Sequence, residues 1–153
     1  MVFRKSIIIL LLVCITVSFN ACGVGDYEYI ISNGFRIVRV NSERIVLSAE
    51  KCIYEFTTKN GNKGLTSCAV ENYINEFCYN EQYIAVKQFD PEKLDFENFE
   101  SNDFSNPAYY LVDAVSTNIY GPYKSQEEFD FACKELNVVG LGEWISTRSN
   151  PKK

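Results

Sequence analysis

The sequence contains no histidine among its 153 residues. Histidine is the side chain whose ordinary pKa lies closest to neutral pH, and it serves as a base in hydrolytic triads and as a common zinc ligand. Its absence excludes a His-based triad, a His-ligated zinc site and a histidine general base. A cysteine nucleophile would lack its usual histidine partner as well.

The sequence also lacks a phosphate-binding loop and a basic surplus. Gly61-Asn62-Lys63-Gly64 does not have the glycine spacing of such loops, and no helix pattern follows it. The net charge is −5, and an acidic chain is repelled by phosphate backbones. No Cys-x-x-Cys pair is present. We therefore expect no nucleic-acid partner, no metal and no cofactor.

A short apolar run stands at the N-terminus. Arg4 and Lys5 precede an apolar stretch over residues 6–19, and Ala21-Cys22 follows it. About 14 apolar residues fall short of the roughly 20 that span a bilayer as a helix, whereas they are typical of a signal peptide. The alternative is an uncleaved single-span anchor.

The end of this run, Phe19-Asn20-Ala21-Cys22, resembles the lipobox of bacterial lipoproteins, Leu-(Ala/Ser/Thr/Val)-(Gly/Ala/Ser)-Cys. Ala21 and Cys22 match it, while Phe19 and Asn20 depart from it; Cys14 is a second candidate. The resemblance implies a signal peptide over residues 1–21, acyl chains on Cys22 and a tether over residues 22–26. A single domain over residues 27–148 would then be held at the outer face of the cytoplasmic membrane, or at an outer membrane.

Four more cysteines, Cys52, Cys68, Cys78 and Cys133, lie in the expected domain. In an exported chain they favour disulfides, with three possible connectivities. The short separation of Cys68 and Cys78 favours that pair, which leaves Cys52 with Cys133. The alternative is free buried thiols that act as small apolar side chains.

The pattern over most of the domain predicts strands. Residues 27–31 and 35–40 flank Asn33-Gly34, a strong hairpin signal because both residues tolerate a positive φ. Further strands are expected at 44–47, 52–57, 82–89 and 108–113, with a turn or flexible loop over 59–64 and a brief return at Ile119-Tyr120 that Gly121-Pro122 ends. Residues 66–80 fit either a strand or a short helix.

One helix is predicted over residues 126–136. Ser125 fits the N-cap, and Glu128 three residues later completes a capping box. Phe129, Ala132, Cys133 and Leu136 would share one face, and the apolar tail after Asn137 is expected to pack back on the sheet. The fold class is α+β: an antiparallel sheet of about five or six strands, built from hairpins, with one C-terminal helix across a face.

Three motifs carry a family resemblance. Tyr109-Tyr110-Leu-Val-Asp113, Tyr120-Gly121-Pro122 and Glu127-Glu128-Phe129 resemble the C-terminal signature of a family of uncharacterised bacterial lipoproteins, a domain of unknown function. The opening hairpin and Tyr83–Gln88 are also similar to that family. The resemblance implies a location and no activity.

Two further clusters suggest candidate sites. Residues 90–107 combine six acids with three phenylalanines, which fits a calcium or interaction loop or, without a bend glycine, a solvated loop. Among ten tyrosines, Tyr120 and Tyr123 beside Gly121-Pro122 are the candidate binding face; the alternative is that the tyrosines fill a small core.

We expect a lipid-anchored envelope protein that is not an enzyme and binds another envelope protein or a wall component. The alternatives are a small-ligand or ion-binding sensor and, more distantly, an envelope hydrolase that uses paired carboxylates.

Overall fold

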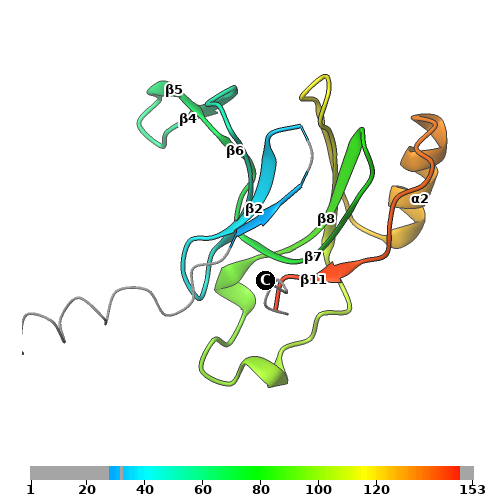
Figure 1. Ribbon diagram of the computed structural model, residues 1–153. Coiled ribbons are helices and arrows are strands. Elements are labelled where there is room, and N and C mark those ends of the chain that lie inside the picture. Colours follow the sequence, from blue (N-terminus) through cyan, green and yellow to red (C-terminus); the bar gives the residue numbers. More distant parts are fainter. Residues whose placement is uncertain (1–27, 32, 149–153) are drawn as a thin grey trace, which may run out of the picture.

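The structure is a computed structural model that describes residues 28–31 and 33–148 (Figure 1). Cys14, Cys22 and the expected signal peptide and tether lie outside the described residues. The strands are β1 (Glu28–Ile30), β2 (Phe35–Arg39), β3 (Ile45–Ala49), β4 (Tyr54–Thr57), β5 (Lys63–Thr66), β6 (Cys68–Val70), β7 (Tyr73–Tyr79), β8 (Tyr83–Phe89), β9 (Ala108–Asp113), β10 (Ile119–Tyr123) and β11 (Ile145–Ser146). The α-helix of the described part is α2 (Gln126–Glu135).

The first hairpin forms where the sequence predicts it. β1 pairs antiparallel with β2, and the turn between them places Asn33 at φ 54° and Gly34 at φ 76°. Asparagine and glycine are the residues that adopt this left-handed backbone at least cost. The local turn chemistry therefore sets the register of the whole edge of the sheet.

Within the described residues, the main sheet has nine strands, more than the five or six expected. They follow the order β1-β2-β3-β7-β8-β9-β10, with β6 on β3 and β11 on β7. Most pairs are antiparallel, but β3 and β7 are parallel. Residues 66–80, which fit either a strand or a short helix, contain the two strands β6 and β7 and no helix. The fold class, α+β with one C-terminal helix, is confirmed.

Each face of the central strands buries its own core. The larger core contains Ile37, Leu47, Phe77, Ile84 and Val112 among its members. The smaller one, which we call the helix-side core, consists of Cys78, Ala85, Tyr109, Leu111 and Phe129. Because successive strand residues point to opposite faces, Phe77 and Cys78 belong to different cores although they are neighbours in sequence.

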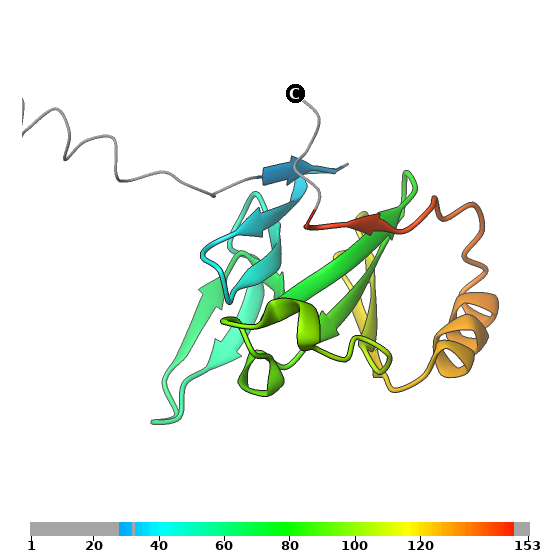
Figure 2. The same ribbon diagram turned by 90° about the horizontal axis from the view of Figure 1, so that it is seen from below.

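Strands β4 and β5 form a separate two-stranded sheet. The sequence predicts a strand that ends at residue 57 and a turn or flexible loop over residues 59–64; instead, the chain turns and returns as β5. We call residues 51–66 the arm. Figures 1 and 2 show it projecting from one end of the molecule, while α2 lies at the other end.

The acidic segment 90–107 has two short 3-10 turns, at Pro91–Lys93 and Phe99–Ser101. Its rings Phe96, Phe99 and Phe104 pack against the larger core, for example with the Tyr73 and Phe96 ring centroids 5.6 Å apart. Its acids satisfy backbone groups: Asp95 Oδ1 accepts hydrogen bonds from the amides of Glu97 and Asn98, at 2.9 Å each. The segment is a surface loop attached by its aromatic side chains.

Helix α2 begins as the sequence predicts. Ser125 Oγ accepts a hydrogen bond from the Glu128 amide at 3.2 Å. The carboxylate of Glu128 reaches one residue further back than a capping box requires and accepts from the Lys124 amide at 2.8 Å. Phe129 is buried on the inner face, and the tail returns over the helix-side core through Val138, Leu141 and Trp144, whereas Val139 is exposed.

Candidate binding groove

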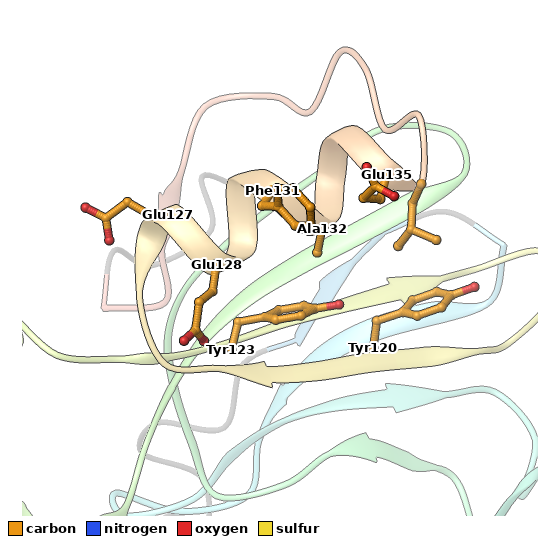
Figure 3. A pocket seen from close by; sticks show the side chains of 8 residues that line it. Tyr120, Tyr123, Glu127, Glu128, Phe131, Ala132 and Glu135 are labelled. Atoms are coloured by element: carbon orange, nitrogen blue, oxygen red, sulfur yellow. The ribbon is translucent and has the colours of Figure 1, made fainter.

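An open groove of about 690 Å³ lies between helix α2 and strand β10. It is lined by Tyr120, Tyr123, Glu127, Glu128, Phe131, Ala132, Glu135 and Leu136. Figure 3 shows the rings of Tyr120 and Tyr123 rising from the strand toward the helix above them. The structure thus brings together both tyrosines that the sequence singles out as a binding face.

The two tyrosines reach the same groove because β10 is irregular between them. Tyr120 is paired with Leu111 and Tyr123 with Tyr109, with a register shift in between. The expectation that Gly121-Pro122 ends the strand is therefore wrong, since pairing resumes at Tyr123. Gly121 has φ +109°, and a Cβ there would lie 2.6 Å from the Tyr109 carbonyl oxygen, so the shift requires glycine at this position.

Aromatic packing holds the strand side of the groove in place. The Tyr109 ring stacks on Phe129 with centroids 5.4 Å apart, and Tyr123 meets Phe129 edge-on at 6.3 Å. Burial raises the pKa of Tyr123, and the neighbouring Cys133 and Tyr120 raise it further. The Tyr123 hydroxyl is therefore a neutral hydrogen-bonding group at physiological pH.

The helix side of the groove is apolar with an acidic rim. Phe131 is 64% exposed, so a large aromatic side chain borders the groove in contact with solvent. Glu127 and Glu135 lie one turn before and after it, and none of the eight lining residues is basic. No ion pair in the described part of the chain involves a lining glutamate, so no basic side chain neutralises this rim.

Sequence reasoning missed these helix residues as part of the site. The signal was present: residues 127, 131 and 135 are spaced by four, which places them on one helical face. That face is separate from the inner face of Phe129 and Cys133. The helical periodicity predicts the buried stripe, and the same spacing indicates that Glu127, Phe131 and Glu135 lie together on a second face.

The four domain cysteines are free thiols that differ in solvent exposure. Cys52 is exposed, Cys68 and Cys133 are half-buried and Cys78 is buried. Burial raises the pKa of Cys68 to about 11 and that of Cys78 to about 12. No disulfide is present among the described residues, which differs from the expected crosslinks.

Topology separates the expected cysteine pairs. Cys68 hydrogen-bonds within β6 to the Val70 carbonyl, whereas Cys78 lies in the helix-side core. Cys52 lies in the arm, just before β4, and Cys133 lies in α2. The arm and α2 are at opposite ends of the molecule (Figures 1 and 2). Short separation in sequence does not bring Cys68 and Cys78 together, because they lie on different strands with different surroundings.

Two further features bear on the chemistry of the chain. Within residues 28–31 and 33–148, no group of three or more potential ligands is arranged to hold a metal ion. Over the same residues, no helix has the length and apolar character needed to cross a bilayer.

A comparison with protein families places the chain in a known family. The family model described as "Protein of unknown function (DUF3997)" matches residues 32–141, well over half of the chain. The chain belongs to this family. The matched range runs from the first hairpin through α2 and includes the whole groove lining of the DUF3997 domain. No curated protein and no solved structure matches the chain.

Proposed function

We propose that this DUF3997 protein is a lipid-anchored, exported protein whose domain binds another polypeptide in the groove between α2 and β10. The observation that carries the binding proposal is the combination of an exposed phenylalanine with an acidic rim in one groove. Exposed apolar area of this kind marks protein interaction sites, and aromatic residues in such sites supply much of the binding free energy.

The chemistry of the lining identifies the class of partner. Three glutamates attract lysine and arginine side chains, and the Phe131 ring and the two tyrosine rings accept apolar groups. An anionic wall polymer or a phosphate-rich ligand would be repelled by the same rim. The partner is therefore a polypeptide segment that carries both basic and apolar residues.

The anchor is supported by the N-terminal segment. Arg4, Lys5, the apolar run over residues 6–19 and Ala21-Cys22 form a signal peptide with a lipidation cysteine. Two or three acyl chains give stable membrane attachment, at about 0.8 kcal/mol for each buried CH₂. The domain would then act as a tethered binding module outside the cytoplasm.

Metabolic labelling tests the anchor. Cells expressing the chain are fed an alkynyl fatty acid, and the label on the protein is measured after click chemistry. We expect label on the unaltered chain and on Cys14→Ser, and none on Cys22→Ser. Label that persists on Cys22→Ser would refute lipidation at that residue.

Photocrosslinking tests the groove. A benzophenone amino acid replaces Phe131 in the full chain, and the control replaces Val139, which is 79% exposed but lies outside the groove. We expect a discrete protein adduct from position 131 in intact cells, mapped by mass spectrometry to a peptide with basic and apolar residues. Equal adducts from both positions, or none from position 131, would contradict the proposed site.

A further inference from the structure

The arm, residues 51–66, exposes several apolar side chains to solvent. Ile53, Phe56 and Leu65 are all exposed, with Leu65 at 60%. Phe56 lies over Gly64, where an added Cβ would come within 2.7 Å of the ring. The arm is a two-stranded sheet of its own, and an isolated hairpin of this size gains stability when it packs against another surface.

The charge of the arm is opposite to that of the rest of the chain. It carries Lys51, Lys59 and Lys63 and one acid, Glu55, in a protein with a net charge of −5. The groove has the reverse combination, with three glutamates around Phe131 and the tyrosines. Both surfaces are apolar with charged edges, and their charges are complementary.

One face of the arm carries a basic and an apolar side chain next to each other. Lys63 and Leu65 are two residues apart on β5, so they point to the same side. Leu65 is directly opposite Glu55, and both line the same shallow depression with Lys63. On the groove, the Phe131 ring has a carboxylate one helical turn away on each side. Glu55 has the same charge as this rim, so Lys63 is the residue of this arm face that can pair with it.

We infer that the polypeptide segment bound in the groove is the arm of a second copy of this chain. This inference rests on the proposed function and names its partner. Leu65 packs on Phe131, and Lys63 meets the glutamate rim. The arm and α2 lie at opposite ends of the molecule in both views (Figures 1 and 2).

A single molecule therefore cannot fill its own groove, and the contact is heterologous. One copy presents its arm and the next presents its groove, so contacts repeat head to tail. Such contacts build rings when the rotation closes and open chains when it does not. On a membrane, chains anchored at Cys22 would associate side by side.

Mixing two single-surface variants tests this arrangement. The arm variant carries Lys63→Glu and Leu65→Asp, and the groove variant carries Phe131→Asp; all three positions are exposed. The lipidated full-length products are purified from membranes in a non-ionic detergent, and their masses are measured by sedimentation. We expect oligomers for the unaltered protein and for the control Val139→Asp, and monomers for either variant alone.

The mixture of the two variants gives the decisive result. The groove variant keeps an intact arm and the arm variant keeps an intact groove, so we expect a one-to-one heterodimer that grows no further. Trp144 fluorescence, measured on each variant, reports whether the helix-side core is intact. Intact variants that fail to form the heterodimer would overturn the inference, as would an unaltered protein that is monomeric.

Photocrosslinking separates this inference from the proposed function. A benzophenone at position 131 should give an adduct with residues 51–66 of a differently tagged copy. An adduct from position 131 with a different protein would overturn the head-to-tail inference and leave the groove as a binding site. A lipid adduct from a probe at position 65 would show that the arm contacts the membrane, and would overturn the inference as well.

Discussion

At the scale of single residues, Gly121 determines whether the groove can form. Its φ of +109° and the 2.6 Å approach of a Cβ to the Tyr109 carbonyl leave no room for a side chain. We expect Gly121→Ala to lower the free energy of unfolding by about 3 kcal/mol. Urea unfolding followed by Trp144 fluorescence measures this, since Trp144 packs in the helix-side core.

Gly140→Ala is the matched control for that substitution. Gly140 also has a positive φ, +69°, but nothing lies within 4 Å of its Cβ position. We expect Gly140→Ala to lower the free energy of unfolding only by the cost of a left-handed backbone at alanine, about 1 kcal/mol. Equal losses at the two positions would contradict the close approach to Tyr109.

The cysteines provide a second prediction at this scale. Alkylation requires the thiolate, and a pKa of about 12 keeps Cys78 protonated through the physiological range. In the native protein at pH 8, we expect iodoacetamide to modify exposed Cys52 first and Cys78 last. Raising the pH toward 12 should speed the reaction at Cys78, because the thiolate fraction rises as the pH approaches the pKa.

Alkylation after denaturation without reductant then tests the free thiols. The structure leads us to expect modification of Cys52, Cys68, Cys78 and Cys133 by the reagent. Peptide mapping that leaves two of them unmodified until reductant is added would establish a disulfide in the mature protein and contradict the free state.

At the scale of the elements, α2 depends on its first turn. Ser125 satisfies the Glu128 amide, and loss of an N-cap hydroxyl costs about 1 kcal/mol. We expect Ser125→Ala to lower the free energy of unfolding in urea by that amount. Ser125→Asp keeps a hydrogen-bond acceptor, so its free energy of unfolding should stay close to that of the unaltered protein. Equal stability of all three would show that the cap does not contribute.

The elements differ in how well the sequence alone predicts them. The Asn33-Gly34 hairpin and the Ser125 cap are local devices, determined by residues within a few positions, and both were predicted correctly. β10 was predicted to stop at Gly121-Pro122, because a proline cannot donate to a ladder. The strand continues because Tyr109 offers pairing beyond the irregularity, a contact that sequence does not reveal.

Contacts between segments that lie far apart in the sequence were harder to predict than these local features. The parallel contact between β3 and β7 and the separate β4–β5 sheet depend on which strands meet after folding. The same holds for the cysteines, whose separation follows from strand placement. Tyr120 and Tyr123 were identified from their position beside the Gly-Pro step, whereas Phe131 and its glutamates needed the orientation of α2 on the sheet.

At the scale of the whole molecule, charge and apolar area are distributed unevenly. An acidic groove with Phe131 occupies one end, and a lysine-bearing arm with Leu65 occupies the other. Charge complementarity of this kind raises association rates and selects partners. Exposed charges are screened by salt, so binding in the groove should weaken several-fold as the ionic strength rises.

Reversing the charge of the groove rim tests whether the acidic groove is the binding site. The benzophenone at position 131 is placed in the full chain and in a chain that also carries Glu127→Lys and Glu135→Lys, and adducts in intact cells are quantified. We expect a strong adduct from the first chain and its loss from the second. Both glutamates are exposed, and little net change in stability is expected, because a lysine is disfavoured in the first turn of α2 and favoured in its last turn. An adduct of equal yield from both chains would contradict an acidic groove as the binding site of this protein.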